Sequence, residues 1–557
     1  MAHTELTEPE TLPAGTLTTH ILPPGAVYPG VPHRYQVYVP AQYDPAQPAP
    51  CMVFMDGAWI FAERMNAPAA LDAAITAGDI PPLIGVFIDY GALPAADEAT
   101  QQGQLYRHVE YDNLTPRFAR FLSEELLPAV SAEYPLSDDP NDRALVGLSS
   151  GAIAAFIAAW QRPDQFRRVW TCVGTYVDML GAHSLPIWVR KCEPKPLRVF
   201  LQETTGDNDR LWGNWPLANQ AMAEAFAFSH YDYKYVVGPG EHDTVHATEI
   251  MPDVLRWLWR DYPQPITAAA TGPIFETLLI PGELWEPVWQ GAQDVLPAAD
   301  TEGRVWFADP ATQTIQRLAD DGAGETIAAY DSPVAAVAMG PDGRLCASQP
   351  EQRRILTFGA DGGQTTVASD IVATSLTLTA AGLLICANPE VGGVSVLDPV
   401  TGARRDYTAD GLGTPGCVAL SPDQAFLAVL SGDGVWGWTW QVGPDGELRY
   451  GQPFFRVEQD EAAPLWRPAA IVVDVSGDHY IPTGRGITLV TQSGRTRETI
   501  AAPQIAALSG GPVTAVAFGG PERDWLYAAQ GGALFRRRLQ RRGAVAWQPV
   551  MPAPWHL

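Results

Sequence analysis

Residues 144–155 read Ala-Leu-Val-Gly-Leu-Ser-Ser-Gly-Ala-Ile-Ala-Ala. A short apolar strand runs here into Gly147-Leu148-Ser149-Ser150-Gly151, and a helix of small residues leaves this turn. A nucleophile elbow requires this strand–turn–helix context, because the chain must reverse sharply at the serine. Glycine is favoured at both flanking positions, where larger side chains would collide. The stretch therefore predicts an exposed serine hydroxyl at Ser149, at the end of a strand.

Outward from this turn, strand-like and helix-like segments alternate between residues 35 and 260. We expect strands at 35–39, 51–55, 83–88, 144–146, 169–173, 197–201 and 233–237. We expect helices at 69–77, 113–134, directly after Ser149, 218–228 and 250–259. Apolar strands separated by helices are typical of a mostly parallel sheet that is covered on both faces. The fold class predicted for this half is an α/β hydrolase, a doubly wound sheet.

The helical pattern stops after Tyr262-Pro263-Gln264-Pro265, and only strands and turns follow. A strand–turn–strand unit recurs with starts at Val295, Val334, Ala373, Thr414, Arg467 and Val513. Spacings of roughly forty to fifty residues are the blade period of a propeller, so we expect six blades. The predicted organisation is an extension with a first strand (1–34), an α/β-hydrolase esterase domain (35–265), a linker (266–274) and a six-bladed propeller (275–557).

Composition limits the partners and the location of the protein. A chain of 557 residues exceeds a single core, and its net charge of −27 disfavours nucleic acid and anionic membranes. The N-terminus has no basic and apolar signal pattern, and the longest apolar run, Ala152 to Trp160, is too short to span a bilayer. Six cysteines form no CxxC pair, which favours buried free thiols in a reducing compartment. We expect a cytoplasmic protein, with a small-molecule ester as partner and homo-oligomerisation as a further expectation.

An elbow serine needs a base and an orienting acid, in the chain order Ser, Asp/Glu, His. The strand 197–201 leads to a turn with Asp207 and Asp209, and the strand 233–237 leads to Gly240-Glu241-His242. Both positions follow strand ends, where active sites of open sheets gather. We take Asp209 as the acid, with Asp207 as the alternative, and His242 as the base, with His246 as a supporting or substrate-contacting residue. A zinc site is disfavoured because the glutamate precedes both histidines.

The oxyanion hole is expected to use backbone N–H groups of Ser150 and of the loop at Gly57 and Ala58. An ordinary tight turn is the alternative for that loop. The candidates for substrate binding are Trp59, Arg107, Glu110 and His246. A structural ion pair is the alternative for Arg107 and Glu110. Tryptophans near these loops suit a sugar or aromatic ester, and equally a plain core.

Residues 35–262 resemble the Putative esterase family, which is related to the enterochelin esterases and carbohydrate esterase family 1 (esterase D-like hydrolases). The matching segments are Tyr35-Gln-Val-Tyr-Val-Pro, Met55-Asp-Gly-Ala, Arg107-His-Val-Glu-Tyr-Asp112, Gly147-Leu-Ser-Ser-Gly151, Leu197-Arg-Val-Phe-Leu-Gln, Gly213-Asn-Trp-Pro-Leu-Ala-Asn219, Gly240-Glu-His242 and Leu255-Arg-Trp-Leu-Trp-Arg260. The resemblance implies serine ester hydrolysis with Ser149, Asp209 and His242, and no cofactor. Ala152 departs from it, because close relatives often carry another glycine there.

Residues 275–550 resemble the gluconolactonase/regucalcin-like (SMP-30) propellers, in which oxygen ligands hold a divalent metal in the central channel. The positions that correspond to those ligands carry Val295-Leu296-Pro297, Thr374, Gly416-Cys417 and Ala469-Ala470. Small and apolar residues cannot replace the hard oxygen ligands of a calcium-like ion. We therefore expect no metal, and a non-catalytic propeller that shapes substrate access, binds part of a substrate or mediates assembly.

The function expected from these patterns is serine carboxylic ester hydrolysis through an acyl-enzyme on Ser149. An acyltransferase that uses the same triad is the first alternative. A binding protein or a metal lactonase that works through the propeller is the second.

Overall fold

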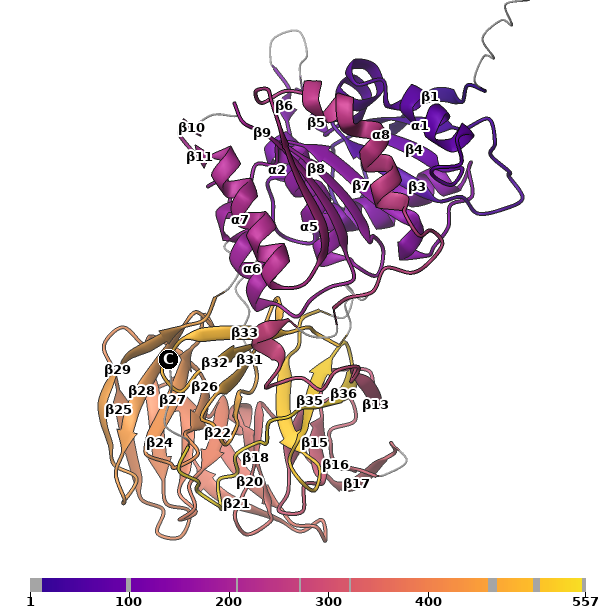
Figure 1. Cartoon of the computed structure of the whole chain (residues 1–557). Coiled ribbons are helices and arrows are strands. Elements are labelled where there is room, and N and C mark those ends of the chain that lie inside the picture. The colour runs from indigo at the N-terminus through magenta and orange to yellow at the C-terminus, as the bar shows by residue number, and fades with distance from the viewer. Residues whose placement is uncertain are drawn as a thin grey trace, which may run out of the picture. The chain divides into compact units, whose positions relative to one another are not determined.

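The structure is a computed structural model that describes residues 13–96, 102–206, 209–269, 272–319, 322–458, 468–503 and 511–552. The chain divides into two compact units, Met1–Arg190 with Pro194–Ala269, and Lys191–Glu193 with Ala270–Leu557. The first unit is α/β and the second is all-β, so the predicted fold class is confirmed (Figure 1).

One eight-stranded sheet organises the first unit, in the order β1-β2-β4-β3-β7-β8-β9-β12. The strands are β1 (Thr16–Leu22), β2 (His33–Val39), β3 (Cys51–Met55), β4 (Ile84–Ile88), β7 (Arg143–Leu148), β8 (Arg168–Cys172), β9 (Arg198–Thr204) and β12 (Asp232–Gly238). The pairs β1–β2 and β2–β4 are antiparallel, and every later pair is parallel. The carboxyl ends of β7, β8, β9 and β12 therefore meet at one edge, where the functional side chains gather.

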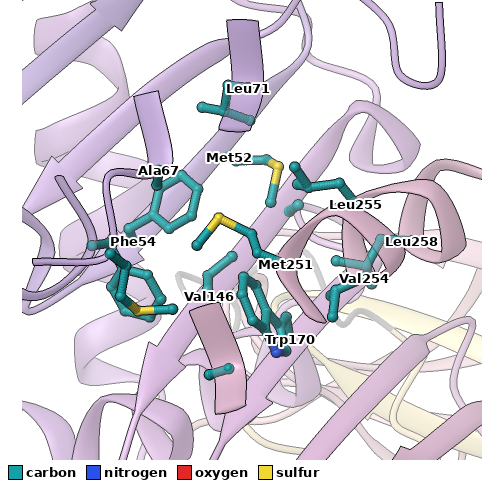
Figure 2. Packing of buried hydrophobic residues seen from close by; sticks show 14 of the residues in the cluster. Met52, Phe54, Ala67, Leu71, Val146, Trp170, Met251, Val254, Leu255 and Leu258 are labelled. Atoms are coloured by element: carbon teal, nitrogen blue, oxygen red, sulfur yellow. The ribbon is translucent and has the colours of Figure 1, made fainter. Parts of the chain in front are cut away.

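The helices lie on both faces of this sheet (Figure 1). They are α1 (Ala67–Thr76), α2 (Arg107–Tyr111), α3 (Arg117–Arg120), α4 (Leu127–Ser131), α5 (Ser150–Gln161), α6 (Leu185–Lys191), α7 (Trp215–Phe228) and α8 (Val245–Trp259). On one face, Met251 and Leu255 of α8 pack against Met52 and Trp170 of the sheet (Figure 2). The two short hairpins are β5 (Ala92–Leu93) with β6 (Gln104–Leu105), and β10 (Asp209–Arg210) with β11 (Gly213–Asn214).

Two local expectations are wrong. The helix expected at 113–134 begins at Arg117 and ends at Ser131, with a π-helical segment, Phe121–Leu126, between α3 and α4. It begins late because the Asn113 side chain accepts a hydrogen bond from the Thr115 N–H, which forms a turn. The expected loop after β3 becomes a π-helical segment, Gly57–Arg64.

In the described part of the second unit there are six four-stranded antiparallel sheets, which are the six expected blades. Their strands are β13 (Glu286–Gln290), β14 (Leu296–Ala299), β15 (Val305–Asp309), β16 (Thr314–Leu318), β17 (Gly324–Ala329), β18 (Ala336–Met339), β19 (Leu345–Gln349), β20 (Arg354–Phe358), β21 (Gln364–Ser369), β22 (Ser375–Leu378), β23 (Leu384–Asn388), β24 (Gly393–Leu397), β25 (Arg404–Thr408), β26 (Pro415–Leu420), β27 (Phe426–Ser431), β28 (Trp436–Val442), β29 (Leu448–Arg456), β30 (Val472–Val473), β31 (His479–Thr483), β32 (Gly486–Val490), β33 (Thr496–Ile500), β34 (Ala515–Gly519), β35 (Trp525–Gln530) and β36 (Ala533–Arg538). Each repeat found in the sequence is the first strand pair of a blade, such as β14–β15. The last blade combines β34, β35 and β36 with β13 from the start of the domain.

The expectation of buried free thiols is confirmed. All six cysteines are buried and free. Within the described part of the chain, every helix is too short or too polar to cross a membrane.

Candidate active site

Ser149 occupies the turn between β7 and α5, with backbone angles φ 58° and ψ −122°. Its N–H donates to the carbonyl of Cys172, at the end of the neighbouring strand β8, with an N···O distance of 2.9 Å. A Cβ atom at Gly147 would lie 1.9 Å from the carbonyl oxygen of Gly151, so the elbow requires glycine there. This positive φ at a non-glycine residue is the strained conformation that a nucleophile elbow uses to expose its hydroxyl.

His242 lies beside the serine hydroxyl. Its Nε2 is 2.9 Å from Ser149 Oγ, within hydrogen-bond distance. The histidine comes from the loop between β12 and α8, and it is partly buried. The Trp215 ring, from the start of α7, meets the imidazole edge-on, with ring centroids 5.7 Å apart. The structure thus brings together two side chains that are 93 positions apart in the chain.

Thr175 is a third residue at the serine, and sequence reasoning missed it. Its Oγ1 lies 3.0 Å from Ser149 Oγ, and Trp215 Nε1 donates to the same Oγ1 at 3.3 Å. Thr175 is buried, in the segment that follows β8. The signal that could have found it is its place after an apolar strand next to the nucleophile strand, because parallel strand ends share an edge.

The backbone of Asp209 belongs to the hairpin that leads into α7. Asp209 pairs with Asn214, the residue that precedes Trp215. The Asn214 side chain caps α7 by accepting a hydrogen bond from the Leu217 N–H at 3.0 Å. Asp207, the alternative acid, lies outside the described residues.

His246 lies on α8. It is buried, and its Nδ1 lies 3.1 Å from Nε2 of Gln202 on β9. A Cβ atom at Gly238 would lie 2.1 Å from His246 Nε2, so the imidazole packs directly on the end of β12. In this position the histidine supports the packing of α8 on the sheet.

The expected oxyanion segment follows β3 through Asp56. The N–H of Ala58 donates to the Asp89 carboxylate at 3.0 Å, so that donor is already engaged. At Gly57 a Cβ atom would lie 2.4 Å from Phe87 Cα, so glycine is required there by packing against β4. Ser150 begins α5, and its side chain hydrogen-bonds Asp112, whose pKa burial raises above the ordinary value despite that bond.

Arg107 forms an ion pair and Glu110 forms hydrogen bonds, but the two side chains do not contact each other as partners. Arg107 donates to both carboxylate oxygens of Asp56, from Nε at 3.1 Å and from Nη2 at 2.7 Å. Glu110 is fully buried, accepts from Gly91 N–H and lies 2.9 Å from Nε2 of His33. Each of the two side chains is thus held by a different residue of the same domain.

Two of the tryptophans near these loops are accessible to solvent. Trp59 is 53% exposed and Trp212 is 45% exposed, whereas Trp215 is buried. Leu211 and Leu217, on either side of the hairpin end, are also exposed. Apolar side chains therefore face solvent on the segments next to Trp215 and His242.

Part of the first half of the chain is similar to known esterases. Residues 28–233 match the family model described as "Putative esterase". The iron(III) enterobactin esterase of Dickeya dadantii is 30% identical over 233 residues, which is 39% of this chain and 48% of that protein. The uncharacterized protein YbbA of Bacillus subtilis is 20% identical over 176 residues, 30% of this chain and 66% of that protein. The chain thus spans about half the length of the first relative.

Solved structures cover each half at lower identity. A gluconolactonase from Xanthomonas campestris is 18% identical, with a TM-score of 0.42 and coverage of 48% of this chain and 94% of its own. The enterobactin esterase FES from Shigella flexneri is 20% identical, with a TM-score of 0.34 and coverage of 45% of this chain and 61% of its own.

The sheet order and the elbow define an α/β-hydrolase domain. More particularly, residues 28–233 are similar to the "Putative esterase" family, and a six-bladed propeller follows this domain in the chain.

The propeller channel contains a cavity of about 190 Å³. Its walls include Leu296, Pro297, Ala469 and Ala470, and none of the described lining residues is a carboxylate. Among the described residues, no group of three or more His, Cys, Asp or Glu side chains is placed to hold a metal ion. The walls are mostly apolar, and the side-chain oxygens that they offer are the hydroxyls of Ser375, Thr377 and Ser421 and the amide of Gln424. Without a carboxylate among the described lining residues, this set does not fit a calcium-like divalent cation.

Proposed function

We propose that the first domain is a serine carboxylic ester hydrolase that acts through an acyl-enzyme on Ser149. The observation that carries this proposal is the 2.9 Å distance between Ser149 Oγ and His242 Nε2, on a turn whose backbone is strained at the serine. The match of residues 28–233 to an esterase family supports the same reaction class.

In this proposal His242 accepts the Ser149 proton while Oγ attacks the ester carbonyl carbon. The protonated imidazole then gives that proton to the leaving alcohol. Water attacks the acyl-enzyme with His242 again as base, and Ser149 Oγ leaves as the proton returns. The N–H groups of Ser150 and Gly57 are the proposed donors to the carbonyl oxygen.

Asp209 is the proposed acid that orients His242. Its backbone partner Asn214 immediately precedes Trp215, and the Trp215 ring contacts the His242 imidazole. This supports a position of the Asp209 backbone near that imidazole. A carboxylate on the other ring nitrogen would hold the tautomer that leaves Nε2 free to accept a proton.

The substrate proposed is a small-molecule ester with a sugar or aromatic part, and the propeller is proposed to be non-catalytic. The exposed Trp59 and Trp212 support an aromatic or sugar contact, because both kinds of ring pack on indole faces. The cavity without carboxylates supports a propeller that does not perform metal-dependent lactone hydrolysis.

The nucleophile is tested with Ser149→Ala in the full chain, and Ser131→Ala, at the end of α4, is the control. We expect Ser149→Ala to abolish p-nitrophenyl acetate turnover and fluorophosphonate labelling, while Ser131→Ala keeps both. Labelling of Ser149→Ala at the wild-type rate would refute the proposal. Acceptor alcohols added to the assay distinguish hydrolysis from acyl transfer, because transfer yields new ester in place of free acid.

The acid is tested with Asp209→Asn and, as its matched control, Asp207→Asn. We expect the first to lower kcat by about 10²- to 10⁴-fold, because a misoriented imidazole cannot accept the serine proton. The second is expected to stay within a few-fold of the wild type. A larger loss of kcat in Asp207→Asn than in Asp209→Asn would assign the acid to Asp207.

A further inference from the structure

The Thr175 hydroxyl and the His242 imidazole both lie within hydrogen-bond distance of Ser149 Oγ. We propose that the Thr175 hydroxyl donates a hydrogen bond to Ser149 Oγ during catalysis, and that Trp215 positions this hydroxyl. The inference rests on the proposed function, because it assumes that Ser149 is the nucleophile. Its geometric basis is the chain of contacts from Trp215 Nε1 to Thr175 Oγ1 at 3.3 Å, and from Thr175 Oγ1 to Ser149 Oγ at 3.0 Å.

The chemistry of the indole ring sets the direction of the hydrogen bonds that run from Trp215 through Thr175 to Ser149. A tryptophan Nε1–H can only donate, so Thr175 Oγ1 must accept from Trp215. A hydroxyl carries one proton, and that of Thr175 is then free to point at Ser149 Oγ. Ser149 Oγ accepts this bond, and its own proton is directed to His242 Nε2, 2.9 Å away. The three contacts thus orient the Ser149 proton toward His242 Nε2 and the Thr175 proton toward Ser149 Oγ.

This hydrogen bond strengthens when the serine oxygen gains charge. As the Ser149 proton moves to His242 Nε2, Oγ becomes partly anionic, and a bond to a charged acceptor is stronger than one to a neutral hydroxyl. The same holds when Oγ leaves the acyl-enzyme as its bond to the acyl carbon breaks. An interaction that is stronger in the transition state than in the ground state accelerates the reaction.

The first turn of α7 holds Thr175 rigidly enough for this role. Asn219 lies four residues after Trp215, on the same helix face, and its Nδ2 donates to the Gly174 carbonyl at 2.8 Å. The Thr175 N–H also donates to the Ser149 carbonyl at 3.3 Å. Thr175 is 1% exposed and Trp215 is 3% exposed, so water does not compete readily for either hydroxyl bond. One helix turn therefore fixes both the backbone and the hydroxyl of the segment facing the serine.

The experiment measures inactivation of the full chain by a fluorophosphonate, in which the Ser149 Oγ–P bond forms, fluoride leaves and the proton passes to His242. Thr175→Val removes the hydroxyl at nearly constant shape, and Thr175→Ser keeps the hydroxyl. We expect Thr175→Val to lower the inactivation rate about 10- to 100-fold, and Thr175→Ser to stay within about threefold of the wild type. Thermal unfolding of each variant confirms that the rates refer to folded protein.

The role of Trp215 is tested with Trp215→Phe, which keeps an aromatic ring beside His242 and removes the N–H. We expect it to lower the rate about three- to tenfold, and to have no further effect in the Thr175→Val background. Multiplicative effects of the two substitutions would overturn the positioning role of Trp215. A Thr175→Val rate within twofold of the wild type would overturn the role of Thr175. If Ser149→Ala is still labelled, the proposed function itself fails, which is a separate outcome.

Discussion

Arg107 holds Asp56 through two hydrogen bonds, at 3.1 Å and 2.7 Å, directly before the segment that begins with Gly57. Asp56 is 1% exposed and has φ 55°, so this pair fixes a buried carboxylate and a left-handed backbone at once. Burial alone would lower the pKa of Arg107, but the bond to Asp56 outweighs it and raises the pKa above its ordinary value. The pair therefore anchors the backbone that is proposed to supply an oxyanion donor.

Arg107→Met is expected to lower the free energy of unfolding by about 2–3 kcal/mol, because it leaves the Asp56 carboxylate buried without a counter-ion. The value is below that of a fully buried pair because the Arg107 side chain is 33% exposed. Urea unfolding measures the change. The double variant Asp56→Asn/Arg107→Met should recover part of the loss, and an equal or greater loss would contradict this account.

The two elbow glycines are expected to differ in their tolerance of a methyl group. At Gly147 a Cβ atom would lie 1.9 Å from a backbone carbonyl, whereas at Gly151 its nearest neighbour would be the Met55 Cβ at 3.2 Å. Backbone cannot move as a side chain can, so Gly147→Ala should abolish activity or folding. Gly151→Ala should give folded protein with reduced activity, measured by circular dichroism and ester turnover. Equal behaviour of both variants would contradict the steric argument.

In the propeller, Glu498 is fully buried on β33, and Arg497 Nε lies 3.0 Å from its Oε2. Burial raises the pKa of Glu498 from 4.5 to about 7, because desolvation outweighs the attraction of the arginine. Between these two values the folded chain holds a proton that the unfolded chain has lost. The contribution of this carboxyl to stability is therefore present at low pH and is lost as pH rises through about 7.

Glu498→Gln mimics the protonated carboxyl, so its effect should depend on pH. We expect the variant to match the wild type near pH 4 and to be more stable by about 3 kcal/mol near pH 8. Thermal or urea unfolding across this range measures the difference. Glu325→Gln, at a half-exposed glutamate paired with Arg317, is the control for removing a carboxylate from the surface of a blade. A constant difference for Glu498→Gln would refute the raised pKa.

Much of the site could be predicted because the residues carry local signals. Ser149 lies between an apolar strand and a small-residue helix, and His242 follows an apolar strand, so both positions follow from pattern alone. The propeller was predictable for a similar reason, since each strand–turn–strand unit repeats and the structure has the six blades.

Other features depend on contacts that a sequence does not reveal. Thr175 reaches the nucleophile because β7 and β8 are neighbours in the sheet. The sequences of parallel strands do not reveal the order in which those strands lie. The orientation of the Trp215 indole depends on the cap at Asn214 and on the packing of α7. Gly57 was expected only as part of the oxyanion loop, and it is the backbone of Phe87, 30 residues later in the chain, that requires glycine at this position.

The pairing of β13 with β36 has a consequence for how the propeller can be made and cut. Residues 286–290 and 533–538 complete a single blade, so synthesis must reach the final strands before the circle can close. A truncation that removes either segment would leave unpaired strand edges exposed to aggregation. A circular permutant that joins these two segments and opens another loop would instead keep every blade whole.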